Sequence, residues 1–280
     1  MGAVDWILNL SIVLLWLGWK ARGPVSHVPQ PGQSLLSTLK PTSRAQTKDW
    51  ALPVAMVGLI LVRSLVYWNI GTATGWNPSL SFGAISITFR SDKLPLILLY
   101  SILVAGLWLI CLQISLTFLL LVNQGRNETE GFQRSIRFMA PLQARLPGFL
   151  LVFIPFVTGF LLWLGLGTLF LKLGLVPKPV SNAHFVQQAA VVGVSSFLIW
   201  RIPITLLLGL YLLNSYVYLG NALMLNYASS TARLLLIPLR YLPLRLGKLD
   251  LTPLAGMAVV FGLDHLITVA LVKVYLRLPL

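Results

Sequence analysis

Charged side chains and cysteines are both scarce in this chain. Only 10% of its 280 residues are Asp, Glu, Lys or Arg, whereas 57% are hydrophobic. So few charges cannot surround a hydrophobic core of this size with a polar surface, which excludes an ordinary water-soluble domain. The single cysteine, Cys111, excludes a disulfide framework, a CxxC redox pair and a cysteine zinc site. The composition predicts a helical membrane protein that crosses the bilayer several times.

Acidic residues are scarcer than basic residues, with seven acidic residues against 21 basic ones. Thirteen of the basic residues lie in three loops, 20–50, 124–146 and 223–250. Basic residues concentrate in the cytoplasmic loops of membrane proteins, so we expect these loops inside and both termini outside. This arrangement explains the net charge of +14 without a nucleic-acid partner.

Hydropathy predicts an all-α, polytopic fold with six transmembrane helices. A span needs about 20 apolar residues, and the first segment is short by that measure. Pro203 in the fifth segment should break its helix, which predicts an outer interfacial helix over 185–200 and a span over 203–222. The outer loop 71–93 alternates apolar and hydroxyl residues near 85–89, which is typical of a short strand pair. The six segments are 6–19, 51–70, 94–122, 148–175, 187–222 and 251–276.

The three basic loops end alike, because a proline opens the span that follows each of them: Pro53, Pro147 and Pro253. Each loop also holds an earlier basic, hydroxyl-bearing stretch that could lie as an interfacial amphipathic segment in the headgroup plane. The pattern predicts three parallel, pseudo-repeated helical hairpins within a single membrane domain, residues 1–280. The stretches are 37–41, 132–141 and 231–243, and the hairpins are 1–72, 94–175 and 185–280.

The last hairpin has the clearest local signals. Residues 246–250 should form a turn that reverses the chain, and Asp250 should cap the final helix. Pro253 falls in the first helical turn, where a missing N–H costs nothing.

The stretch from Thr231 to Pro253 resembles the YggT family of small integral membrane proteins, called YlmG in plastids. The resemblance extends over about 205–276 and, through the repeat, more weakly over 7–70. It implies a multi-pass protein of the bacterial inner membrane, or of a plastid membrane, that is non-enzymatic and linked to envelope or osmotic stress or to assembly of a cytochrome complex. Arg233 and Thr252 stand where family members usually have proline and serine. The motif residues are Thr231, Pro238, Arg240, Pro243, Asp250 and Pro253.

Ionisable residues within the predicted spans are candidates for a functional site. Arg63 lies ten residues after Pro53, and Asp264 lies eleven after Pro253. Equivalent hairpins would place both residues at one depth, so we expect an Arg63–Asp264 ion pair, with His265 beside it. The pair could fix two spans together, or it could form part of an ion or solute pathway with Arg201 as a further member.

Small residues follow one face of the last span, at Ala255, Ala258 and Gly262, and His265 continues the face. Such a face lets another helix approach closely. A haem or other planar ligand against His265 is the alternative interpretation.

The basic interfacial segments should bind anionic lipid headgroups or dock a larger membrane complex. No GxSxG, HExxH, P-loop or paired-carboxylate pattern occurs, and no cofactor is expected. We therefore expect a non-enzymatic accessory or assembly subunit, and a small transporter or channel is the alternative. The basic residues are Arg134, Arg137, Arg233, Arg240, Arg245 and Lys248.

Overall fold

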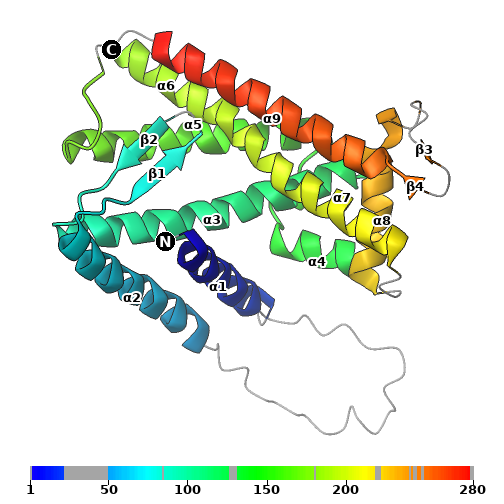
Figure 1. Ribbon diagram of the computed structural model, residues 1–280, viewed down its shortest axis with the longest axis horizontal. Coiled ribbons are helices and arrows are strands. Elements are labelled where there is room, and N and C mark those ends of the chain that lie inside the picture. The colour runs from blue at the N-terminus through cyan, green and yellow to red at the C-terminus, as the bar shows by residue number, and fades with distance from the viewer. Residues whose placement is uncertain are drawn as a thin grey trace, which may run out of the picture. The chain divides into compact units, whose positions relative to one another are not determined.

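The computed structural model (Figure 1) describes residues 2–21, 50–83, 85–125, 131–179, 181–217, 222–239, 241, 245–246 and 249–277. Six helical segments within these residues are long and apolar enough to cross a membrane, which confirms the predicted class of multi-pass helical protein. They are α1 (Gly2–Ala21), α2 (Ala51–Thr74), α3 (Leu94–Val122), α5 (Gly148–Lys172), the run Asn182–Tyr216, and α9 (Thr252–Arg277). The arrangement of these helices as three repeated hairpins stays a prediction.

Shorter elements connect the spans. The run Asn182–Tyr216 consists of α6 (Asn182–Ser195), a 3₁₀ stretch (Ser196–Trp200) and α7 (Arg201–Tyr216). The remaining elements are β1 (Ser79–Phe82), β2 (Ile85–Thr88), α4 (Gly131–Met139), 3₁₀ turns at Gln143–Arg145 and Ile237–Leu239, α8 (Leu223–Leu235), β3 (Arg245–Leu246) and β4 (Leu249–Asp250).

The chain divides into two compact units. The first contains α1, α2 and the start of α3 up to Leu109. Its helix α1 has 20 residues, enough for about 30 Å, so the expectation of a short first segment is wrong. Most of the extra length lies at the start, where Asp5 belongs to the helix instead of preceding it.

The second unit contains residues 77–89 and 110–280. Its β1–β2 hairpin confirms the predicted strand pair, with Phe82 opposite Ile85 in an antiparallel ladder. Alternate residues of both strands are buried, as expected for strands that cover a helix with one face. The Phe82 ring lies 5.7 Å from the ring of Trp163 on α5, so the hairpin packs on that helix.

Helices α5 and α6 pack closely along a line of glycines. The buried face of α5 recurs every four residues and includes Gly159. A Cβ atom added at Gly159 would lie 2.0 Å from the Ser196 hydroxyl oxygen and 2.9 Å from the Val192 carbonyl oxygen. The approach of α6 to α5 therefore depends on the absence of a side chain at this position.

The fifth span changes its helical geometry before Pro203 but continues as one run from Asn182 to Tyr216, so the predicted break into two separate helices is not observed. The helix tightens to 3₁₀ geometry over Ser196–Trp200, and α7 then places Pro203 in its first turn, where proline is tolerated. Helix α7 ends at Tyr216, earlier than the predicted end at residue 222. The predicted turn before α9 is confirmed by pairing of Arg245 with Asp250.

Gly159→Ala should lower the stability of the fold, whereas Gly165→Ala on the same helix should not. The added methyl group at position 159 collides with α6 and should cost about 1–3 kcal/mol of unfolding free energy. At Gly165 the new Cβ meets no atom within 4 Å, and alanine favours helix over glycine. Unfolding by increasing mole fraction of sodium dodecyl sulfate measures both variants. Equal stabilities would contradict the glycine-dependent packing.

Candidate functional site

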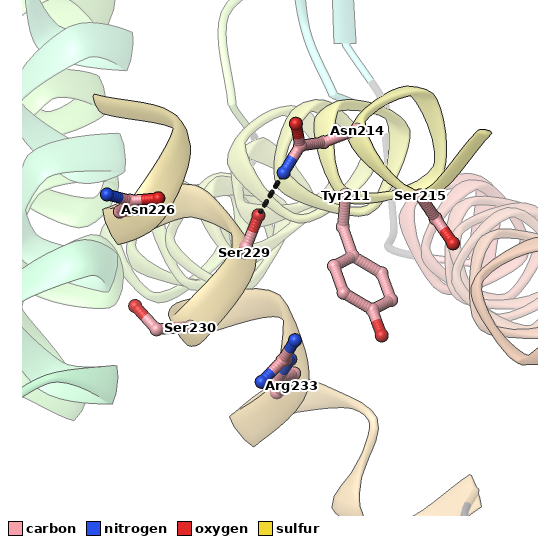
Figure 2. A pocket seen from close by; sticks show the side chains of 7 residues that line it. All are labelled: Tyr211, Asn214, Ser215, Asn226, Ser229, Ser230 and Arg233. Carbon is pink, nitrogen blue, oxygen red and sulfur yellow. Dashed lines mark hydrogen bonds between the residues drawn. The ribbon is translucent and has the colours of Figure 1, made fainter. Parts of the chain in front are cut away.

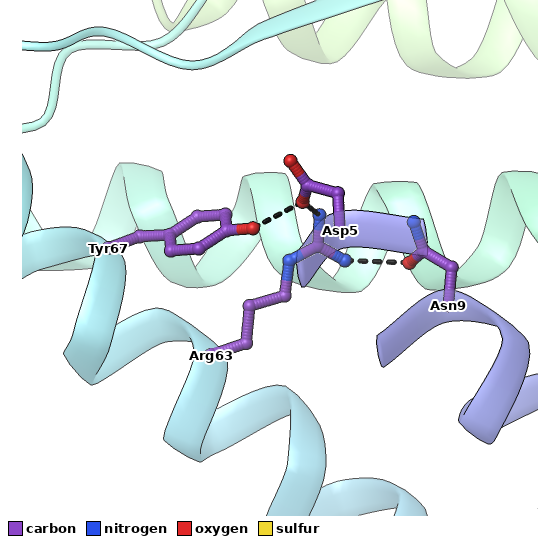
Figure 3. A network of polar contacts seen from close by, with 4 residues as sticks. All are labelled: Asp5, Asn9, Arg63 and Tyr67. Carbon is purple, nitrogen blue, oxygen red and sulfur yellow. Dashed lines mark hydrogen bonds and ion pairs between the residues drawn. The ribbon is translucent and has the colours of Figure 1, made fainter. Parts of the chain in front are cut away.

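A buried cluster of polar side chains joins α1 to α2 (Figure 3). Arg63 lies near the centre of α2, and its side chain is only 1% exposed. Its Nη2 donates to Asp5 Oδ1 at 2.6 Å and its Nη1 to Asn9 Oδ1 at 2.8 Å, so both acceptors come from α1. The Tyr67 hydroxyl, one turn beyond Arg63, also donates to Asp5.

Two aromatic rings complete the enclosure of Arg63. The centroids of the Tyr67 and Tyr100 rings lie 5.2 and 5.4 Å from the guanidinium carbon, so the cation lies close to two electron-rich rings. Tyr100 belongs to α3, so three helices contribute to the cluster. The guanidinium is shielded from lipid and neutralised by Asp5, which suits a structural clamp.

A second ion pair joins α7 to α9. Arg201 Nη1 donates to Asp264 Oδ2 at 2.5 Å. Asp264 lies twelve residues after Thr252 and thirteen before Arg277, which puts it about 18–20 Å along the helix from either end of α9. Half of the Arg201 side chain is uncovered, with 51% exposed, whereas Asp264 is 12% exposed. The second carboxylate oxygen of Asp264, Oδ1, is buried and has no hydrogen-bond partner among the described residues.

These two pairs correct the predicted Arg63–Asp264 ion pair. Each residue takes a partner from its own unit, Asp5 for Arg63 and Arg201 for Asp264. The prediction used depth along the helices alone, and it left Asp5 outside the first span. His265 does not join the second pair, because consecutive helical residues point about 100° apart. Its side chain is exposed.

Several residues of the motif that resembles the YggT family are described in the structure, and they make structural contacts. Asp250 Oδ1 accepts the backbone N–H of Thr252 at 3.0 Å, so Asp250 caps α9 as predicted. Pro253 is buried in the first turn of that helix, and Pro238 lies exposed in a 3₁₀ turn. Arg240, Pro243 and Lys248 lie outside the described residues, as does the side chain of Arg245.

Thr231 belongs to a buried network that the sequence did not reveal. Its hydroxyl donates to Asn123 Oδ1 at 3.1 Å, and Asn123 Nδ2 donates to the Tyr227 hydroxyl at 2.8 Å. Asn123 directly follows α3, so the network ties this end of α3 to α8. The sequence signal that could have indicated this network is the amide side chain of Asn123 at the end of an apolar run.

Three of the six basic interfacial residues lie on helices. Arg134 and Arg137 lie on α4, a strongly amphipathic helix whose Gln133 and Ile136 are buried. Arg233 lies in the last turn of α8, with its guanidinium carbon 6.0 Å from the centre of the Tyr211 ring. Among the residues that the structure describes, no three His, Cys, Asp or Glu side chains come together as a metal site.

Removing either partner of the Asp5–Arg63 pair should destabilise the protein more than removing both. Arg63→Leu leaves Asp5 without its cation, and Asp5→Leu leaves a buried guanidinium, so each should cost about 3 kcal/mol. The double variant should recover most of this loss. Detergent unfolding measures all three, and Ser64→Ala, a buried neighbour that bonds only to its own helix, is the control. Strictly additive losses would contradict the clamp.

Comparison with protein-family models, with curated proteins and with solved structures finds no match to this chain.

Proposed function

We propose that this protein is a non-enzymatic accessory or assembly subunit of a larger membrane complex, and that it docks on a transmembrane helix of that complex through α7 and α9. The observation that carries the proposal is the uncovered half of Arg201, beside the centre of α9. The resemblance of residues 231–253 to the YggT family favours the same role. We expect the protein in the bacterial cytoplasmic membrane or in a plastid membrane. The distribution of its basic residues favours both termini on the outer side.

An uncovered guanidinium is costly in hydrocarbon. An arginine at the centre of a span costs about 2.5–3.5 kcal/mol on insertion scales. Asp264 neutralises the charge of Arg201 but occupies only one of its nitrogen atoms, Nη1. The other N–H groups form no hydrogen bond with the described residues. A partner helix with carbonyl, hydroxyl or carboxylate acceptors would satisfy these donors and exclude lipid from them.

The outer face of α9 is shaped for a close neighbour. Ala258, Gly262 and His265 are exposed, and a Cβ built at Gly262 meets no atom within 4 Å. Within the second unit, no described helix covers these three residues. Small residues allow two helix backbones to approach, so the face offers a second contact for a partner.

Transport of a small ion or solute is the second candidate. It is favoured by the same pair, because Asp264 Oδ1 is buried without a partner among the described residues and Arg201 is half exposed. An intramembrane carboxylate beside an accessible cation is a common element of ion pathways. The two candidate functions predict different results when the protein is purified. An assembly subunit should bring a partner complex with it, whereas a transporter should be recovered with lipid alone.

Affinity purification of the tagged protein from its native membrane in a mild detergent should recover a stoichiometric membrane complex. Gly262→Leu should reduce that recovery at least fivefold, because the side chain blocks the close approach. Leu263→Phe is the matched control, since it adds bulk to an exposed residue about 100° further round the helix and should leave recovery unchanged. Mass spectrometry measures the partner, and an absorption spectrum of the eluate tests for a haem against His265.

A colourless eluate that contains only this protein and lipid would contradict the assembly role. An ion or solute flux in proteoliposomes that disappears in Asp264→Asn would then support transport. Equal recovery of a complex by Gly262→Leu and wild type would contradict docking through the small-residue face.

A further inference from the structure

A polar cavity of about 290 Å³ lies between the last turns of α7 and one face of α8 (Figure 2). All seven residues that line it carry hydroxyl, amide or guanidinium groups, in contrast to the apolar surface of the neighbouring spans. Tyr211, Asn214 and Ser215 come from α7, and Ser229, Ser230 and Arg233 come from α8.

The walls of this cavity are held in place by contacts behind α8 and by one contact between two lining residues. The Asn123 side chain bonds Tyr227 and Thr231 on the buried face of α8, and these bonds fix the rotation of the helix. Asn214 Nδ2 donates to the Ser229 hydroxyl at 3.3 Å and so joins the two walls. A cavity with fixed walls binds its ligand without the cost of ordering them.

The charge of the lining selects an anion. Arg233 is the one charged residue among the seven, and none of them is acidic. Its guanidinium lies beside the Tyr211 ring, which holds the cation at the wall. The hydroxyls of Tyr211 and Ser215 form no hydrogen bond with other described residues. A guanidinium with several hydroxyl donors matches the oxygen atoms of a phosphate group.

The position of the cavity identifies the source of that phosphate. It lies beside the last turns of α7, where the candidate membrane span finishes, and along the amphipathic helix α8 that follows. The end of a span and an amphipathic helix meet at the level of the lipid headgroups. Its volume is at the low end for ligand sites and suits a headgroup rather than a whole lipid.

We propose that this cavity is a binding site for the phosphodiester headgroup of an anionic glycerophospholipid, with Arg233 on the phosphate and the hydroxyls of Tyr211 and Ser215 as further donors. The site is independent of the docking face on α9. It differs from general attraction of a basic surface to anionic lipid, because it depends on neutral side chains as well as on charge.

Native mass spectrometry of the delipidated protein in detergent, titrated with phosphatidylglycerol, tests this proposal. The wild type should bind one molecule of phosphatidylglycerol more tightly than any further molecules. Arg233→Gln should weaken that binding at least tenfold, and Tyr211→Phe, which keeps the ring and the net charge, about threefold. Arg134→Gln is the control, because it removes an exposed interfacial arginine from α4 and should change the affinity less than twofold.

Equal weakening by Arg233→Gln and Arg134→Gln, with no effect of Tyr211→Phe, would overturn the proposal, because general attraction alone gives this pattern at about fivefold per arginine. Titration with inorganic phosphate distinguishes the source of the ligand. Displacement of the tight lipid by millimolar phosphate would assign the cavity to free phosphate and overturn the lipid site. Retention of the lipid would support it.

Discussion

A charge within hydrocarbon must be neutralised, and the two Arg–Asp pairs of this protein satisfy that constraint in different ways. Arg63 is enclosed completely, with Asp5 and Asn9 as acceptors and two tyrosine rings around the guanidinium. This pair joins α1 to α2 within the first unit. It provides a specific contact between helices whose apolar surfaces have no preference for each other over lipid.

The pair in the second unit leaves half of its arginine uncovered. Asp264 removes the net charge, yet the guanidinium keeps donors that hydrocarbon cannot satisfy. Arg63 also keeps one donor, Nε, without a partner among the described residues, but that donor is buried within the cluster. The exposed half of Arg201 instead offers a surface that a partner would complete. The exposed small residues of α9 lie on another face of the same helix. Among the six candidate spans, α9 has the smallest buried share, 11%.

Hydropathy and local signals predicted much of the fold. The apolar runs located all six spans, and the alternating residues of 85–89 indicated the strand pair. The cap at Asp250 followed from its position before an apolar run. These features depend on residues near one another in sequence, so composition and spacing are enough to identify them.

The partners of the intramembrane charges could not be predicted in the same way. Spacing from a proline gives the depth of Arg63 and Asp264, but not the direction in which each helix face points. In the sequence, Asp5 is the charge that ends an apolar run, which is typical of a residue that flanks a span. In the structure Asp5 belongs to α1, and its charge is neutralised by Arg63 of α2. The cavity beside Arg233 depends likewise on how α8 packs on α7 and α3.

The most direct test of these pairings is a double-mutant cycle measured by detergent unfolding, in which Asp264→Leu is combined either with Arg201→Leu or with Arg63→Leu. The ion pairs described here predict a coupling energy above about 1 kcal/mol for Asp264 with Arg201. They predict additivity within about 0.5 kcal/mol for Asp264 with Arg63. Coupling of Asp264 to Arg63, with none to Arg201, would contradict the account.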